Sequence, residues 1–102
     1  MPEVQDYTIQ EEKLAGYAKA IAHPARIFIL NFLDRQCVCF AGDLSERLPI
    51  APSTVSQHLK ALKDAGLIQG TINPPTIKYC INRSNWEEAK ALFADFFDKK
   101  GC

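Results

Sequence analysis

Hydrophobic and polar positions follow a helical period over the first third of the chain. Within residues 7–22, apolar side chains recur at mixed spacings of three and four residues, which predicts an amphipathic helix. Residues 23–35 place Pro24 where a helix would begin, and their apolar side chains cover almost the whole circumference. We therefore expect a first helix with one apolar side and a second helix that is central and buried.

Two further helices are predicted in the middle of the chain, separated by the turn P-I-A-P at residues 49–52. Asp43 and Glu46 have the spacing of a capping box at the start of a short helix. We expect the helix after the turn to stop at Gly66, since glycine is typical of the first position beyond a helix C-terminus.

A β-hairpin and a last helix complete the pattern. Ile77, Tyr79 and Ile81 alternate with polar residues, so we expect them to share one face of a strand that follows the turn N-P-P-T. Ser84 and Glu87 have the spacing of a second capping box, before a helix over residues 84–99. The chain is therefore predicted to be one mainly α domain, residues 1–102, with a small β-hairpin.

The helix that ends at Gly66 has an unusual polar side. Projected at about 100° per residue, its leucines and Val55 form a stripe that faces the core. The opposite arc, in the first half of the helix, holds Ser53, Ser56, Gln57 and Lys60. In a helix-turn-helix, such side chains at the start of the second helix contact base edges and phosphates, whereas Glu would repel phosphates. Because a hairpin follows, the pattern favours a winged helix-turn-helix that binds double-stranded DNA.

These segments resemble the ArsR/SmtB family of bacterial metal- and stress-responsive repressors. The resemblance rests on H-P-A-R-I-F-I-L-N-F-L, on G-D-L-S-E-R-L-P-I-A-P, on the run S-x-H-L-K-x-L-x-x-A-G-L at residues 56–67, and on the hairpin. It implies a dimeric winged-helix protein that represses its own operon and leaves DNA when an inducer binds. It also implies a recognition helix at 53–65, a wing at 67–82, and dimerisation through the first and last helices, the last at 84–99.

The expected DNA contacts combine this face with neighbouring basic residues: Ser53, Thr54, Ser56, Gln57, His58, Lys60, Lys63 and Lys78. Lys63 and Lys78 would contact phosphates. His58 lies at the flank of the core stripe, so packing inside the protein is the favoured role for it and a phosphate contact is the alternative. The formal net charge is zero, but residues 1–22 carry four acids and two lysines (net −2), whereas residues 53–83 carry four basic residues and one acid (net +3).

Six apolar residues of the first and last helices form the expected dimer interface: Leu14, Tyr17, Trp86, Phe93, Phe96 and Phe97. A chain of 102 residues has little interior with which to cover both helices. A two-fold interface would cover them and align two recognition helices with successive major grooves. The alternative is that both helices pack on their own core.

The cysteines are the candidate site for an inducer. Cys37 and Cys39 form a C-V-C motif three residues earlier than in the arsenic-responsive relatives, which places them in a loop. In an extended loop, thiols at i and i+2 point the same way and bind one soft ion. Arsenite or antimonite takes three thiolates, and the third is expected to be Cys102, with Cys80 less favoured. Two alternatives remain open: a redox switch that forms a disulfide or polysulfide, and a purely structural role.

Other classes of protein fit the sequence less well. The N-terminus carries acids before Lys13 and no secretory signal, so we expect reduced thiols and a cytoplasmic location, and no apolar run is long enough to span a membrane. The chain has no C-x-x-C motif and no evident catalytic triad, so we expect no enzyme and no resident cofactor. A winged helix that binds only proteins remains an alternative. Salt-dependent binding to duplex DNA would distinguish a DNA-binding protein from this alternative.

Overall fold

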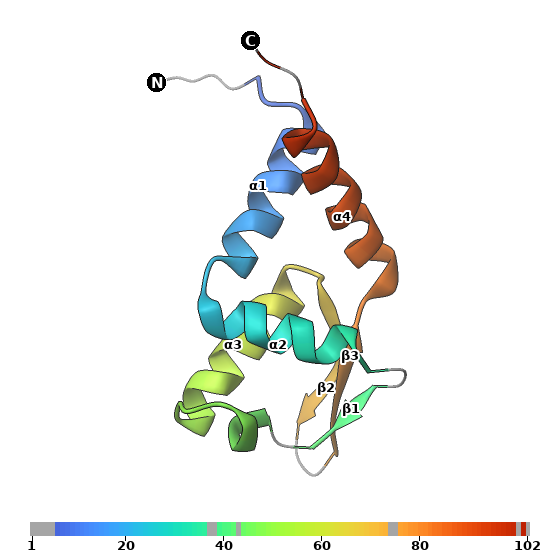
Figure 1. Cartoon of the computed structure of the whole chain (residues 1–102). Coiled ribbons are helices and arrows are strands. Elements are labelled where there is room, and N and C mark those ends of the chain that lie inside the picture. The colour runs from blue at the N-terminus through green and yellow to red at the C-terminus, as the bar shows by residue number, and fades with distance from the viewer. Residues whose placement is uncertain (1–5, 37–38, 43, 74–75, 100, 102) are drawn as a thin grey trace.

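The computed structural model describes residues 6–36, 39–42, 44–73, 76–99 and 101 of the chain (Figure 1). The elements follow the order α1 (Ile9–Ile21), α2 (Pro24–Asp34), β1 (Phe40–Ala41), the 3₁₀ helix η1 (Leu44–Arg47), α3 (Pro52–Asp64), β2 (Ile68–Asn73), β3 (Thr76–Ile81) and α4 (Arg83–Phe97). This order confirms the predicted mainly α fold with a helix-turn-helix and a hairpin. It also adds one strand, β1, that the sequence analysis does not predict.

The starts of α1 and α2 are set by local hydrogen bonds. The Thr8 hydroxyl accepts the Glu11 N–H at 3.0 Å, and the Glu11 carboxylate accepts the Thr8 N–H at 2.8 Å. Because this capping box satisfies two amides at the helix end, α1 begins after Thr8, and Tyr7 stays outside it with 72% of its surface exposed. His23 caps α2: its Nδ1 accepts the Ala25 N–H at 3.0 Å, and Pro24 occupies the first turn as predicted.

The start of α4 differs from the prediction. Asn82 is the N-cap residue, and its side-chain oxygen accepts the Asn85 N–H at 3.2 Å. The predicted capping box of Ser84 and Glu87 is therefore wrong, because both residues already lie inside the helix. The other predicted box cannot be compared, because Asp43 lies outside the described residues.

Three antiparallel strands form a sheet in the order β1-β3-β2. In the register, Tyr79 of β3 pairs with Phe40 of β1 on one side and with Gly70 of β2 on the other. Tyr79 and Ile81 are buried and Lys78 is exposed, which confirms the predicted alternation; the side chain of Ile77 lies outside the described part. Gly70 has φ +138°, and a Cβ there would overlap the backbone of β3.

The core lies between α2, α3 and the sheet, and the inner ends of α1 and α4 contribute to it. Its buried side chains are Tyr17, Ala20, Ile29, Leu30, Leu33, Leu44, Val55, Leu59, Leu62, Leu67, Ile68, Tyr79, Ile81 and Ala89. The prediction that α2 is central and buried is correct for one side of the helix only, because Ile27 and Phe28 are 42% and 41% exposed. Neighbouring elements cover α2 on the side that carries Ile29 and Leu33 and leave part of the opposite side open.

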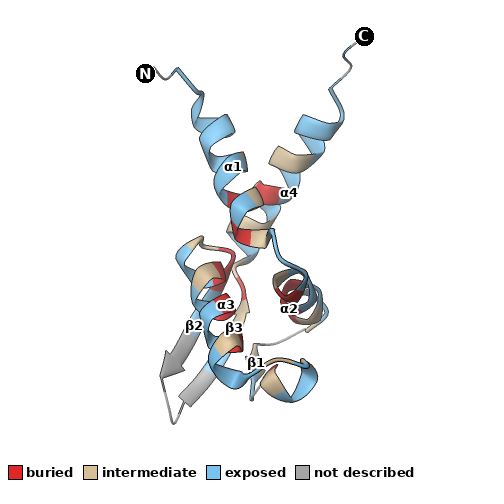
Figure 2. Cartoon of the chain, turned by 90° about the vertical axis from the view of Figure 1, so that its left-hand side faces the viewer, coloured by how far each residue is buried: buried red, intermediate tan, exposed pale blue. Residues whose placement is uncertain are grey.

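Helices α1 and α4 project together from one end of the molecule, which measures 49 × 32 × 23 Å along its principal axes (Figure 1). They are joined where they cross: Lys13 Nζ lies 2.7 Å from one oxygen of Glu88, and the Tyr17 hydroxyl donates to the other at 2.7 Å. Figure 2 shows that the two helices separate toward the chain ends and that their outer turns are exposed. The outer halves of α1 and α4 therefore belong to the surface of this single chain.

Candidate nucleic-acid interface

Helix α3 has one buried side and one exposed polar side. Val55, His58, Leu59 and Leu62 face the core. The predicted contacts Ser53, Ser56, Gln57 and Lys60 are all exposed, and Thr54 is partly buried beside them. The helical projection therefore places these side chains correctly, on a surface that α3 presents away from the core.

The first turn of α3 is suited to a negatively charged partner. It contains no acidic residue, and Pro52 supplies no N–H. The N-cap residue is Ala51, which makes no side-chain hydrogen bond to the helix. Amides at the start of a helix that lack such a cap, together with the helix dipole, favour phosphate groups. The start of α3 thus adds to the polar face a second feature that DNA can use.

The three predicted lysine contacts differ in their surroundings. Lys60 forms an ion pair with Asp64 at 2.9 Å, and its side chain remains 71% exposed. Such surface pairs contribute little to stability, so Lys60 can exchange its partner for a phosphate at small cost. Lys63 donates from Nζ to the Gly70 carbonyl at 2.8 Å and thereby ties α3 to β2. Lys78 is exposed on β3.

His58 lies on the inner side of α3, with only 8% of its surface exposed. Its Nδ1 accepts a hydrogen bond from Arg26 Nε at 3.0 Å, and its ring stacks at a tilt on His23, with 4.5 Å between centroids. Burial lowers the pKa of His58, and the neighbouring His23 and Arg26 lower it further. This environment matches the packing role that the sequence favours for His58, so His58 is left out of the proposed DNA-contacting face.

Arg26 holds this arrangement together. Besides the bond to His58, its NH1 nitrogen donates to the Ala20 carbonyl at 3.0 Å, near the end of α1. The sequence analysis does not give Arg26 a place in the site. The available signal was a basic residue in the first turn of α2, but the partners of Arg26 lie on two other helices.

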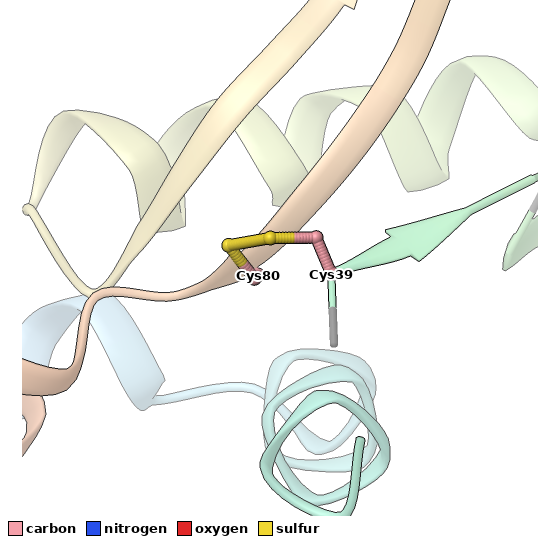
Figure 3. The surroundings of a disulfide bond; sticks show 2 residues. All are labelled: Cys39 and Cys80. Atoms are coloured by element: carbon pink, nitrogen blue, oxygen red, sulfur yellow. A yellow bond between two sulfur atoms is a disulfide. The ribbon is translucent and has the colours of Figure 1, made fainter. Parts of the chain in front are cut away.

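The cysteines are arranged differently from the prediction. Cys39 forms a disulfide with Cys80 of β3 (Figure 3). The expectation of reduced thiols is therefore wrong for this pair. The other two predicted ligands, Cys37 and Cys102, lie outside the described residues. Among the residues that are described, no three His, Cys, Asp or Glu side chains gather closely enough to hold a metal ion.

The predicted dimer residues form two groups. Tyr17 is buried, and Leu14, Trp86 and Phe93 are partly buried. Burial, followed by the hydrogen bond to Glu88, raises the pKa of Tyr17 to about 12, so its hydroxyl stays protonated and donates. Phe96 and Phe97 are 52% and 75% exposed near the end of α4. Tyr17, Trp86 and Phe93 therefore pack in this chain's own core, whereas Phe96 and Phe97 are exposed and Leu14 lines an open groove between α1 and α4.

The short helix, the turn, α3 with its exposed polar face, and the antiparallel strands define a winged helix-turn-helix transcription regulator. The family model described as "Bacterial regulatory protein, arsR family" matches residues 23–69, and the chain belongs to this family. It is thus a DNA-binding transcription regulator and not an enzyme. In the described part of the chain, no helix has the length and apolar character that crossing a membrane requires.

Named relatives extend this similarity over most of the chain. The HTH-type transcriptional regulator YgaV of Escherichia coli is 33% identical over 94 residues, which are 92% of each chain. The HTH-type transcriptional regulator CmtR of Mycobacterium tuberculosis is 34% identical over 82 residues, 79% of this chain and 68% of the relative. Among solved structures, M. tuberculosis Rv0081 matches with a TM-score of 0.64 and 26% identity, over 90% of this chain and 91% of that one. An ArsR-like regulator from Rhodococcus sp. RHA1 has a TM-score of 0.65 at 23% identity, over 83% of this chain and 79% of that one, which shows a shared fold.

Proposed function

We propose that the protein represses transcription by binding operator DNA as a dimer, with α3 in the major groove, and that a signal acting on its cysteines releases it. The observation that carries the proposal is the exposed face of Ser53, Ser56, Gln57 and Lys60. Short polar side chains let the backbone come close to DNA, and Gln and Lys supply donors for base edges and phosphates.

The basic residues near this face have different roles in the proposal. Lys78 is exposed on β3 and is positioned for a phosphate, whereas Lys63 is engaged with the Gly70 carbonyl. We propose that Lys63 mainly holds α3 against β2 through this hydrogen bond and that it can also contact a DNA phosphate. Thr54, partly buried at the start of α3, is positioned to contact the DNA backbone.

A second copy of this chain is the proposed partner of α1 and α4. Phe96 and Phe97 expose large aromatic surfaces, and an open groove of about 510 Å³ between the outer turns of the two helices is lined in part by Leu14, Leu92 and Phe96. Burying such surfaces stabilises an isologous interface. Because α1 and α4 project from the end of the molecule opposite η1, a dimer formed there leaves both copies of α3 uncovered (Figures 1 and 2).

The proposed signal is thiol chemistry, for which there are two candidates. Arsenite or antimonite would bind Cys37, Cys39 and Cys102 as thiolates, and this requires Cys39 to leave its disulfide with Cys80 first. The second candidate is oxidation and reduction of the thiols themselves, and the disulfide favours it. A protein with these roles works where the bacterial chromosome is, in the cytoplasm.

Duplex binding by variants of α3 tests the proposal. DNA from upstream of the protein's own gene and a scrambled duplex of equal length are titrated over a range of salt concentrations. Lys60→Ala should weaken binding to both duplexes and reduce the slope of log K against log salt by about one. Gln57→Ala should reduce the discrimination between the two duplexes by about 1–3 kcal/mol.

Lys90→Ala is the matched control, because Lys90 is also an exposed helical lysine paired with an acid, Glu87 at 3.4 Å. It lies on α4, so its loss should leave DNA binding unchanged. If Lys60→Ala and Gln57→Ala bind both duplexes as tightly as the wild type, α3 is not the DNA-contacting helix. A protein that binds neither duplex in a salt-dependent manner would instead support the protein-interaction alternative.

A further inference from the structure

The disulfide joins two segments that are far apart in sequence and adjacent in the sheet. Cys39 immediately precedes β1 and Cys80 lies in β3, 41 residues later. Because Phe40 pairs with Tyr79, the two cysteines are opposite each other at the next position of the ladder, and their Cα atoms are 4.4 Å apart. Figure 3 shows both side chains directed at each other between the two segments. The fold itself therefore brings these two sulfur atoms together.

The pair lies where small reagents can reach it. Tyr79 and Ile81 point into the core from β3, so Cys80 points to the other side of the strand, as exposed Lys78 does. Cys39 and Cys80 are both only partly buried. A disulfide buried in the core would be inert, but this one is open to exchange with dissolved thiols.

The disulfide closes a covalent loop of the chain that contains the whole proposed DNA-contacting face. Between Cys39 and Cys80 lie β1, η1, α3 and β2, and therefore every residue of the proposed DNA-contacting face. β1 contributes only two residues to the ladder, so its backbone pairing with β3 is short. Lys63 connects α3 to the neighbouring strand β2 through Gly70. The covalent bond thus ties β1 to the sheet, and α3 is attached to the same sheet through β2.

We propose that Cys39 and Cys80 form a reversible dithiol–disulfide switch, and that the disulfide form binds operator DNA more tightly than the dithiol form. This rests on the operator binding proposed above. In the disulfide form, β1, β3 and α3 are held in one arrangement before DNA arrives, so less ordering is needed on binding. In the dithiol form β1 is held by the two-residue ladder, by side-chain packing and by the hydrogen bond of 3.3 Å that the Tyr79 hydroxyl donates to the carbonyl of Gly42, the residue after β1. Without the covalent bond, part of the binding free energy goes into ordering this region.

A low-molecular-weight disulfide such as glutathione disulfide serves as the oxidant. The thiolate of one cysteine attacks a sulfur of the reagent, which forms a mixed disulfide and releases one glutathione thiol. The second cysteine then attacks the protein sulfur of the mixed disulfide and releases the second glutathione. Two thiol protons and two electrons leave the pair, and one glutathione disulfide becomes two glutathione molecules. An excess of thiol reverses both steps.

The test measures the DNA affinity and the thiol state of the same samples. The full chain is equilibrated with glutathione disulfide or with dithiothreitol, and its binding to a fluorescent duplex from upstream of its own gene is followed by anisotropy. Mass spectrometry of the alkylated peptides identifies the bonded cysteines. The oxidised wild type should contain the Cys39–Cys80 linkage and bind at least about fivefold more tightly than the reduced one, the lower end of typical coupling between two sites.

Variants separate this pair from the other thiols. Cys39→Ser and Cys80→Ser should bind DNA like the reduced wild type under both conditions, whereas Cys102→Ser should keep the full response. If circular dichroism shows that either serine variant is unfolded, the comparison of oxidised and reduced wild type still tests whether the disulfide changes the DNA affinity.

Several outcomes overturn the switch and leave operator binding intact: no Cys39–Cys80 linkage after oxidation, equal affinity in the two states, tighter binding by the reduced state, or loss of the response in Cys102→Ser. If neither state prefers the upstream duplex over a scrambled one, operator binding itself has failed.

Discussion

Acidification should destabilise the fold through His58. Its pKa in the folded protein lies below the ordinary value of 6.5, because of burial first and then of His23 and Arg26. Above pH 6.5 the ring is neutral in both states, so stability does not change through this group. As the pH falls below 6.5, the unfolded chain takes up the proton first, and the free energy of unfolding falls until the pH reaches the folded-state pKa.

The size of this effect follows from the linkage relation. When the pH falls from about 7.5 to about 5.5, the unfolded chain takes up the histidine proton first, and each unit of difference between the pKa values of the two states corresponds to about 1.4 kcal/mol of stability. For a domain of this size, that corresponds to a fall in Tm of roughly 5–10 °C. Thermal unfolding followed by circular dichroism at the two pH values measures it.

His58→Gln is the control, because its amide oxygen can accept from Arg26 Nε and does not titrate in this range. All other titratable groups are shared, so the difference between the two proteins isolates the contribution of His58. The wild type should lose more stability than the variant on acidification. Equal losses in the two proteins would refute the assignment of the pH dependence to this ring.

The remaining predictions concern assembly, the disulfide and the wing. Phe96→Glu should convert a dimer into monomers in sedimentation velocity, whereas a wild type that is already monomeric at micromolar concentration would contradict the proposed interface. Cys80→Ser should lower the free energy of unfolding by up to about 4 kcal/mol, since the lost bond spans 41 residues, and dithiothreitol should remove the difference from wild type in urea titrations. Gly70→Ala should cost about 1–3 kcal/mol in thermal unfolding, because φ is +138° and a Cβ would meet the backbone of β3. Gly16→Ala, where a Cβ meets nothing within 4 Å, should instead be stabilising, so a loss in both glycine variants would contradict the steric argument.

The helix-turn-helix was predictable because its boundaries carry local signals. Pro24 marks the first turn of α2, and Gly66 adopts φ +85° directly after α3, as a helix-ending glycine does. The exposed face of α3 was predictable for the same reason, since a helical projection needs only the residue spacing. The cap of α4 was not predicted correctly because Asn82 and Ser84 are both good cap residues. Since β3 ends at Ile81, the helix can begin directly after it, and Asn82 becomes the cap.

Features that depend on distant partners were not predictable. β1 is two residues long, so it has no period to detect, and it exists because β3 offers an edge to pair with. Cys39 and Cys80 become neighbours only through that register. In the sequence, the C-V-C spacing instead suggests that Cys39 acts together with Cys37. The packing role of His58 follows from the helical projection, but its hydrogen-bond partner Arg26 was not predictable, because Arg26 comes from another helix.

Arg26 also has a mechanical consequence. Its planar guanidinium makes two hydrogen bonds of 3.0 Å from one rigid group, one to the end of α1 at Ala20 and one to α3 at His58. Because the two donor nitrogens are fixed relative to each other, movement of the Ala20 carbonyl away from His58 beyond the reach of a hydrogen bond breaks one of the two bonds. Arg26 therefore links α1, which we propose packs against a second copy, to α3, which we propose faces DNA, and the relative orientation of two recognition helices in such a dimer would depend on this arginine.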